Sequence, residues 1–138
     1  MIRRATAEDV DEVVSIFEPS FALLDFLPKL HTHEENVAFF RRMVAEGECW
    51  LADGGFALLK DDTLWHLYVL PDRIGTGVGH ALFEHVKTRR PNGFDLWVFQ
   101  ENERARRFYE AHGAVPVKFT DGSANEEKTP DVRYEWRP

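Results

Sequence analysis

The stretch that decides the fold is LYVLPDRIGTGVGHALFEHVK, residues 67–87 of a 138-residue chain. It begins as the apolar end of a strand, passes through glycines at positions 75, 77 and 79, and continues as an amphipathic helix. Glycines at such a turn let successive backbone N–H groups point at one spot beside the positive end of the helix dipole. The stretch therefore predicts an anion site, and in particular a phosphate site.

Two common phosphate-binding motifs do not fit this loop. A Walker loop ends in Gly-Lys-Ser/Thr, whereas His80 and Ala81 follow Gly79 here. A dinucleotide fingerprint spaced from Gly75 and Gly77 needs a small residue at position 80, which is His80, and no acidic residue ends the next strand. A nucleotide-binding protein of another fold is therefore disfavoured.

A second motif follows in FQENERARRFYEAHGAVPV, residues 99–117. Asn102 is a good N-cap for a helix, and His112-Gly113 is an ordinary helix end. Tyr109 lies about two turns after Asn102 and shares its helix face. The motif thus predicts a short helix that presents a polar cap and a phenol on one side.

The remaining pattern predicts helices and strands in a mixed α/β arrangement. Thr32 and Glu35 have capping-box spacing, Asp53-Gly54-Gly55 marks a hairpin, and Pro19 is expected to stop the first helix near Glu18. The expected strands are 2–4, 48–53, 55–60, 63–70, 94–99, 114–120 and 131–137, and the expected helices are 6–18, 33–46, 77–90 and 102–112.

Composition narrows the class of protein. The chain carries 17 basic and 24 acidic side chains, a formal charge of −7, which argues against nucleic acid as a partner. No apolar run is long enough to span a membrane, and the opening MIRRATAEDV lacks the apolar core of a signal peptide. Cys49 is the only cysteine, so no intrachain disulfide is possible. We expect one domain, residues 1–138, that is cytoplasmic and binds neither nucleic acid nor membrane.

The charge is unevenly distributed along the chain. Residues 1–70 hold 6 basic and 13 acidic side chains, whereas residues 71–118 hold 8 basic and 6 acidic ones. The mildly basic middle would suit a small anion, and the acidic remainder would attract a cation. Solubility alone is the alternative explanation of this pattern.

Taken together and in this order, the two motifs resemble those of the GCN5-related N-acetyltransferase (GNAT) family, of the bacterial small-acetyltransferase type. The element order and the opening IRRAT-AEDV extend the resemblance over nearly the whole chain. It implies a mostly antiparallel sheet with helices on both faces and a V-shaped splay between strands 63–70 and 94–99. The matching residues are Val69, Pro71, Gly75, Gly77, Gly79, Asn102, Ala105, Phe108, Tyr109 and Gly113.

The resemblance implies acetyl-CoA as co-substrate and no metal. Its pantetheine arm would pair with the strand backbone at 67–69, and its pyrophosphate would lie on the N–H groups of 74–79. The chain departs from the family in having Ile74, where Gln or Arg usually precedes the first glycine, although Arg73 stands one place earlier. Arg104 and Arg106 are further cations for the 3′-phosphate. The expected cofactor-binding residues are Leu67, Tyr68, Val69, Arg73, Ile74, Gly75, Thr76, Gly77, Val78, Gly79, His80, Asn102, Ala105, Phe108 and Tyr109.

The catalytic roles implied by the resemblance are an oxyanion donor and a general acid. The backbone N–H of Leu67 would stabilise the oxyanion, and the Tyr109 phenol would protonate the departing thiolate. The general base stays open. Thr63 and Trp65 occupy the usual positions and cannot take a proton, while His66 should point to the opposite face by strand alternation.

Two loops that wall the acceptor pocket in the family supply other candidates for the base, and a water molecule is a further one. The candidates in the loop that enters the second helix are His31, His33 and Glu34. Those in the last loop are Asn125, Glu126 and Glu127. His31-x-His33 also suggests a metal, but no third ligand is specified. The expected acceptor-binding residues are His31, His33, Glu34, Trp65, Asn125 and Glu126.

Two functions from different classes fit these residues. The first is an acetyl-CoA-dependent N-acetyltransferase that acetylates a primary amine of a small molecule or peptide. The second is a CoA-binding regulatory or sensory domain without turnover, which the missing base on strand 63–70 favours. Whether the protein is a monomer or a homodimer is left open, because exposed aromatic residues of the final strand suit either.

Overall fold

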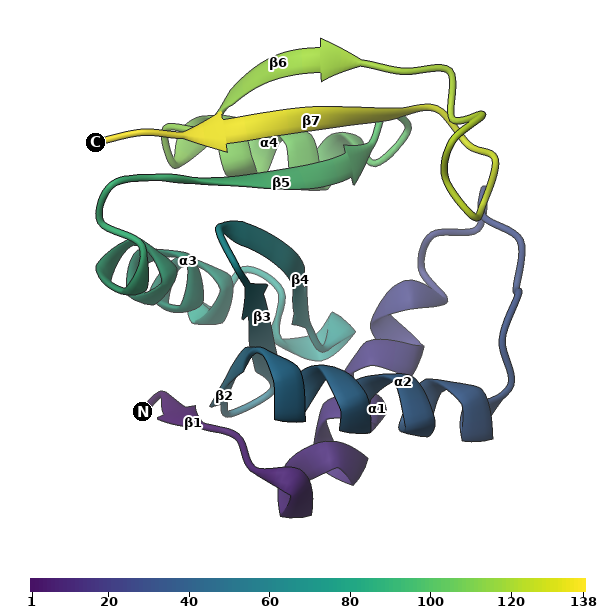
Figure 1. Ribbon diagram of the computed structural model, residues 1–138, viewed down its shortest axis with the longest axis vertical. Helices are drawn as coiled ribbons and strands as arrows, with labels where there is room; N and C mark the ends of the chain where they lie inside the picture. The colour runs from purple at the N-terminus through teal and green to yellow at the C-terminus, as the bar shows by residue number, and fades with distance from the viewer.

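The computed structural model describes residues 1–138 and is organised around a seven-stranded sheet of order β1-β2-β3-β4-β5-β7-β6 (Figure 1). All neighbouring strands are antiparallel except β4 and β5, which are parallel. The predicted mixed, mostly antiparallel sheet is confirmed. The strands are β1 (Arg3–Arg4), β2 (Glu48–Ala52), β3 (Gly55–Lys60), β4 (Thr63–Val69), β5 (Phe94–Phe99), β6 (Val115–Phe119) and β7 (Asp131–Trp136).

Helices cover both faces of this sheet. The helices are α1 (Val10–Phe21), α2 (His33–Glu46), α3 (Val78–Arg89) and α4 (Glu103–Ala111), with short 3₁₀ turns at Ala7–Asp9 and Pro71–Arg73. Helices α1 and α2 lie on the face of the β1–β4 half, and α4 lies behind β5 and β7 (Figure 1). No helix is long and apolar enough to cross a membrane.

The core consists of two clusters, one on each side of the sheet, and β3 contributes to both. Phe56 and Leu58 belong to the cluster under α1 and α2, whereas Ala57 and Leu59 belong to the cluster under α3 and α4. All four side chains are fully buried. Because both faces of β3 are buried, its side chains are apolar in a continuous run and do not alternate between apolar and polar.

The prediction that Pro19 stops the first helix is wrong, because α1 continues through it to Phe21. The proline ring removes one backbone hydrogen bond from the last turn. The Ser20 side chain stabilises this turn in two ways. Its Oγ lies 2.6 Å from the Ile16 carbonyl oxygen of the same helix, and 3.0 Å from the Val69 carbonyl oxygen, which is a tertiary contact. The end of α1 is thereby attached to the end of β4.

The parallel contact between β4 and β5 is short. It joins Thr63 with Asp95 and Leu64 with Leu96, and then the two strands separate. A β-bulge occurs at the same point, because Leu58 of β3 pairs with His66 while Leu59 pairs with Leu64. Trp65 is thus the extra residue of β4, and a bulge bends its strand. The predicted splay between the fourth and fifth strands is confirmed.

The capping box at the start of α2 gives a stability prediction. The Glu35 N–H donates to Thr32 Oγ1 at 3.2 Å, and the Thr32 N–H donates to Glu35 Oε1 at 2.8 Å. We expect Thr32→Ala to lower the free energy of unfolding by about 1 kcal/mol, measured by urea denaturation. Thr88→Ala is the control, because the Thr88 hydroxyl bonds only to the His85 carbonyl on the exposed side of α3. Equal losses in the two variants would contradict the capping role.

Candidate active site

The separation of β4 from β5 leaves one edge of β4 without a strand partner. The Leu70 N–H donates to the Gly54 carbonyl at 2.8 Å, on the β3 side. Since N–H groups alternate in direction along a strand, those of Leu67 and Val69 point to the open side. Nearer the start of the strand, the Asp62 carbonyl accepts from the Asp95 N–H at 3.0 Å, so the bulge reverses which residues face β5. An extended ligand can therefore pair with this edge in place of a strand.

A cavity of about 530 Å³ lies where the strands separate. Its volume is typical of a small-molecule site, and most of its lining is apolar. It lies among β4, β5, the end of α1, α4 and the β6–β7 loop. Its lining residues are Phe21, Leu24, Thr63, Leu64, Trp65, His66, Leu67, Tyr68, Leu96, Trp97, Val98, Phe99, Asn102, Ala105, Tyr109, Thr120, Ala124, Asn125, Glu127 and Asp131.

Two phenols reach this cavity from opposite faces of the sheet. Tyr109 comes from α4 and packs against Phe83, with ring centroids 5.6 Å apart. Tyr68 comes from β4 and packs edge-on against Phe17 of α1 at 5.2 Å. Burial raises the pKa of both phenols, so both stay protonated at neutral pH. Neither hydroxyl has a hydrogen-bond partner within the chain, and each is free to donate to a ligand.

Helix α4 places Tyr109 through its N-cap. Asn102 Oδ1 accepts from the Ala105 N–H at 3.2 Å, so this side chain is occupied in starting the helix. Asn102, Ala105 and Tyr109 line the cavity from one helix face, as their spacing predicts. Phe108 lies on another face, where it packs against His112 with a centroid distance of 4.2 Å.

The glycine loop leads into the N-terminus of α3. Gly75 and Gly77 have φ values of +83° and +95°, and no atom lies within 4 Å of a Cβ built on either. Glycine is therefore required there by backbone conformation and not by space. The N–H groups of the first turn of α3 have no backbone acceptor, as at any helix start. The Thr76 N–H, by contrast, donates to the Arg73 carbonyl at 3.2 Å and is turned into the loop.

The other polar side chains expected near the cofactor are mostly engaged within the protein. Arg73 pairs with Asp53 at 2.9 Å. Arg106 donates to the Tyr134 hydroxyl at 3.0 Å. His80 Nδ1 lies 2.9 Å from His112 Nε2. Ile74 and Arg104 are exposed.

The histidines of the α1–α2 connection are engaged in ion pairs and do not line the cavity. His31 Nε2 bonds to a carboxylate oxygen of Glu126 in the β6–β7 loop, and this carboxylate raises the pKa of His31. His33 Nδ1 lies 3.0 Å from the Glu18 carboxylate, which raises the pKa of His33. Glu34 is exposed on the first turn of α2. The connection and the β6–β7 loop meet at one side of the molecule (Figure 1).

Of the expected acceptor-binding residues, Trp65 and Asn125 line the cavity. Asn125 serves the loop itself, since its Nδ2 donates to the Thr129 carbonyl at 2.7 Å. Glu127 lines the cavity, whereas Glu126 does not. Sequence reasoning missed Trp97, which is 46% exposed on β5. The signal was its place in FDLWVF, where Phe94, Leu96 and Val98 form the buried face and Trp97 must face outward.

His66 faces the cluster under α1 and α2, as strand alternation across the bulge allows. Its ring packs against Phe39 and Phe40, with centroids 5.8 and 5.3 Å away. Nε2 is buried and has no hydrogen-bond partner. Burial lowers the pKa of His66 to about 4, so the ring is neutral at physiological pH.

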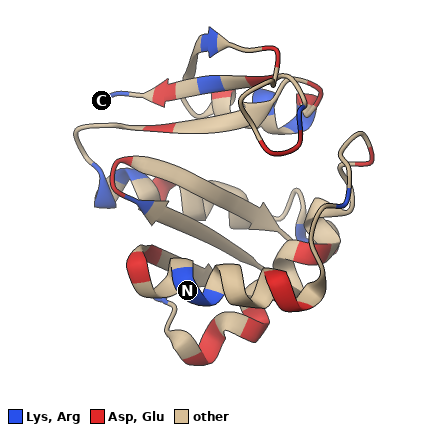
Figure 2. Ribbon diagram, turned by 45° about the vertical axis from the view of Figure 1, so that its right-hand side comes forward, with Lys and Arg blue, Asp and Glu red and all other residues tan.

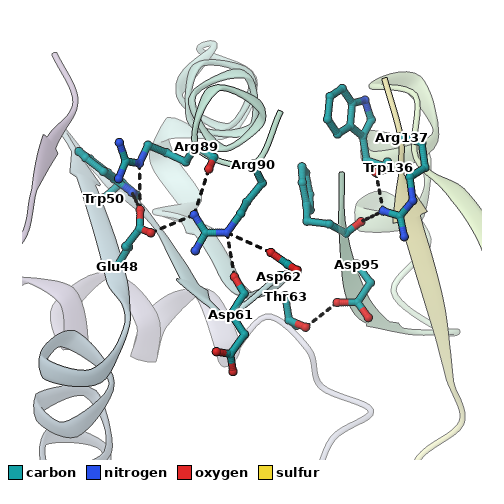
Figure 3. A network of polar contacts seen from close by, with 11 residues as sticks. Glu48, Trp50, Asp61, Asp62, Thr63, Arg89, Arg90, Asp95, Trp136 and Arg137 are labelled. Carbon is teal, nitrogen blue, oxygen red and sulfur yellow. Dashed lines mark hydrogen bonds and ion pairs between the residues drawn. The ribbon is translucent and has the colours of Figure 1, made fainter. Parts of the chain in front are cut away.

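A second cavity, of about 550 Å³, lies beyond the point where β4 and β5 meet. Its arginines pair with carboxylates. Arg89 and Arg90 pair with Glu48 at 3.0 and 2.9 Å (Figure 3), and Arg133 pairs with Asp95 at 2.8 Å. Thr63 donates to Asp95 at 2.5 Å across the strand junction. Of these contacts, the bond from Thr63 of β4 to Asp95 of β5 joins the two strands where they touch, while the arginines tie α3 to β2 and β7 to β5.

The link between His31 and Glu126 gives a pH prediction. A histidine whose pKa is raised on folding stabilises the protein fully below its unfolded pKa of 6.5, and the contribution is lost as pH rises through the folded pKa. We expect His31→Gln to lower the free energy of unfolding by less than about 1 kcal/mol at pH 6, because the pair is exposed, and by almost nothing at pH 9. Urea denaturation at both pH values measures this. A loss that does not change with pH would contradict the ion pair.

Comparison with known proteins agrees with this geometry. Residues 33–113 match the model of the acetyltransferase (GNAT) domain. The chain is 33% identical to the peptidyl-lysine N-acetyltransferase YjaB of Escherichia coli over 120 residues, which cover 81% of this chain and 80% of that protein. An uncharacterised N-acetyltransferase of Archaeoglobus fulgidus is 28% identical over 78% of this chain and 88% of its own length.

Solved structures share the whole architecture. The apo form of E. coli YjaB superposes with a TM-score of 0.78 at 26% identity, over 99% of this chain and 96% of that one. The PaiA N-acetyltransferase of Thermoplasma acidophilum, solved with coenzyme A, has a TM-score of 0.74 at 18% identity, over 100% and 98% of the two chains. The sequence motifs, the splayed sheet and these matches lead to one conclusion: the chain belongs to the GCN5-related N-acetyltransferase family of enzymes.

Proposed function

We propose that this enzyme transfers the acetyl group of acetyl-CoA directly to a primary amine, and that the amine is the side chain of a peptidyl-lysine. The observation that carries the proposal is the unpartnered hydroxyl of Tyr109 in the cavity where β4 leaves β5. A group held there lies beside the free strand edge and can donate a proton to an atom leaving a ligand bound along it.

Acetyl-CoA fits the geometry of the splay. Its pyrophosphate would accept hydrogen bonds from the first-turn N–H groups of α3, where the helix dipole favours negative charge. Its pantetheine amides would pair with the open edge at Leu67 and Val69. Phosphate binding would use mainly backbone N–H groups, because Arg73 is paired with Asp53 and Ile74 carries no charge.

The reaction follows from this placement. A neutral amine attacks the thioester carbonyl, and the Leu67 N–H would stabilise the oxyanion. When the carbon–sulfur bond breaks, the Tyr109 hydroxyl supplies a proton to the thiolate. Burial keeps the Tyr109 phenol protonated, and it also raises the proton affinity of the thiolate formed beside it.

A lysine side chain matches the acceptor side of the cavity. Acidic side chains outnumber basic ones on α1 and α2, the two helices on this face (Figure 2). Trp65 and Trp97 are about half exposed and offer apolar and π surface to an aliphatic ammonium chain. The matched YjaB is named a peptidyl-lysine N-acetyltransferase, which supports the same acceptor class here.

The glycine loop gives a prediction about acetyl-CoA binding. We expect Gly77→Ala to weaken acetyl-CoA binding at least tenfold by titration calorimetry, since a φ of +95° strains any residue with a Cβ by about 1–2 kcal/mol and the loop would shift. Gly113→Ala is the control. Its φ is +94° and its Cβ would meet only ordinary contacts at 3.6 Å, so it carries similar strain away from the loop. A similar loss of affinity in both variants would refute the phosphate site.

Tyr109 gives a prediction about the rate of acetyl transfer. We expect Tyr109→Phe to lower kcat by about 10²–10³-fold while acetyl-CoA affinity stays within about threefold, because only the proton donor is lost. Tyr134→Phe is the matched control, because the Tyr134 hydroxyl donates to Glu110 at 2.5 Å and does not line the cavity. Unchanged kcat in Tyr109→Phe would remove the general acid. Acetyl-CoA binding by the wild type without acetyl transfer would favour the sensory alternative.

A further inference from the structure

We propose that Glu127 binds the ammonium group of the acceptor in this cavity and accepts its proton, and that the Tyr68 hydroxyl is the second polar contact of the same nitrogen. The inference rests on the proposed function, since it names the group that recognises and activates the amine. Several polar side chains line the cavity, and only some of them lack a hydrogen-bond partner within the chain.

Most of these polar side chains are already engaged. Thr63 bonds to Asp95, and Asn102 bonds to the backbone of Ala105. Thr120 and Asn125 both donate to the Asp131 carboxylate, and Asn125 also donates to the Thr129 carbonyl. His66 lacks a partner but is neutral and enclosed by aromatic rings. The polar groups left without a hydrogen-bond partner are the indole N–H groups of the half-exposed Trp65 and Trp97, the hydroxyls of Tyr68 and Tyr109, and the carboxylate of Glu127. The other carboxylate of the lining, Asp131, accepts from Thr120 and Asn125, so Glu127 is the one carboxylate there without a hydrogen bond.

No ion pair of the protein includes Glu127, although the pKa of His31 is raised first by the hydrogen bond and charge of Glu126, then by the charge of Glu35 and then by that of Glu127. The neighbouring Lys128 donates from Nζ to the Ser123 carbonyl at 2.8 Å and so turns away from the cavity. The adjacent Glu126 is paired with His31 on the outer side of the loop. A carboxylate facing a largely apolar cavity without a partner is a strong site for an ammonium ion.

The loop holds Glu127 in a fixed position. Asn125 accepts from the Thr129 N–H at 3.2 Å, and the Thr129 hydroxyl donates to the Glu127 carbonyl at 3.0 Å. Lys128, directly after Glu127, has a φ of +53°, a left-handed conformation that is uncommon outside glycine. The neighbouring side chains have different surroundings, since Glu127 lines the cavity while Glu126 contacts His31.

Glu127 and the two phenols converge in space. All three line the same cavity, and the pKa of Tyr68 is raised by burial first, then by Tyr109 and then by the charge of Glu127. An ammonium bound by Glu127 and Tyr68 would face Tyr109, which enters the cavity from the other side of the sheet. Trp65 and Trp97 also line this part of the cavity and would contact the aliphatic part of the acceptor.

The proton balance is complete with these groups. Glu127 takes one proton from the ammonium, and the neutral nitrogen forms a bond to the thioester carbon. The carbon–sulfur bond breaks, and the thiolate receives the Tyr109 proton. The surplus proton on the amide nitrogen restores Tyr109, and Glu127 releases its proton to solvent, so that ammonium and acetyl-CoA give amide, free CoA and one proton.

The test compares Glu127→Gln with its neighbour Glu126→Gln, using acetyl-CoA and a lysine peptide that the wild type acetylates. If the carboxylate takes the proton, wild-type kcat/KM is level between about pH 6.5 and 8.5, where ammonium and carboxylate coexist. Glu127→Gln accepts only the neutral amine, so its kcat/KM is about 10²-fold or more lower at pH 7 and rises about tenfold per pH unit. Glu126→Gln keeps the wild-type profile.

The outcomes are distinct. Acetylation by the wild type together with parallel pH profiles for Glu127→Gln and Glu126→Gln would overturn the role of Glu127 and leave the proposed function standing. A wild type that acetylates no lysine peptide and no small amine would overturn both. Thermal melting confirms that the variants fold. Glu127→Ala, measured in the same way, replaces Glu127→Gln if the latter melts early.

Discussion

The parallel contact between β4 and β5 joins only two pairs of residues, and the rest of the candidate site depends on its ending there. A parallel pair that continued along both strands would satisfy the N–H groups of Leu67 and Val69 with backbone carbonyls of β5. It would also close the gap in which Tyr109 lies. The bulge at Trp65 and the hydrogen bond from Thr63 to Asp95 act on either side of this point: the bulge bends β4 away, and the hydrogen bond joins β4 to β5.

This geometry gives one cavity with two unlike sides. On one side α4 contributes Tyr109 from the cluster shared with α3, and on the other β4 and the β6–β7 loop contribute Tyr68 and Glu127. In the proposed reaction, the proton donor and the proton acceptor would therefore approach the reacting bond from opposite sides. Burial raises the pKa of both phenols and keeps them neutral at neutral pH.

The sequence predicted the fold almost completely, because each element has a local cause. The capping box at Thr32, the hairpin at Asp53–Gly55 and the glycines of the loop before α3 all act within a few residues. Pro19 was misjudged because the contact of Ser20 with Val69 joins residues far apart in sequence. For the same reason the sequence marked the loop containing Asn125, Glu126 and Glu127 without showing which carboxylate turns inward. That choice depends on a contact between distant segments, because Glu126 bonds to His31, 95 positions away. The assignment of individual site residues stays a prediction.

The line along which β4 and β5 part also divides the chain by sequence. β1 to β4, together with α1 and α2, come from residues 3–69, and β5, α4, β6 and β7 come from residues 94–136, with α3 between them. Each half of the sheet is thus a continuous segment with its own local strand pairings. Such segments are natural units of cooperative folding, and during synthesis the first is complete before the second leaves the ribosome. Because the cavity takes residues from both segments, it comes into existence only when they dock, so binding competence marks the last step of folding.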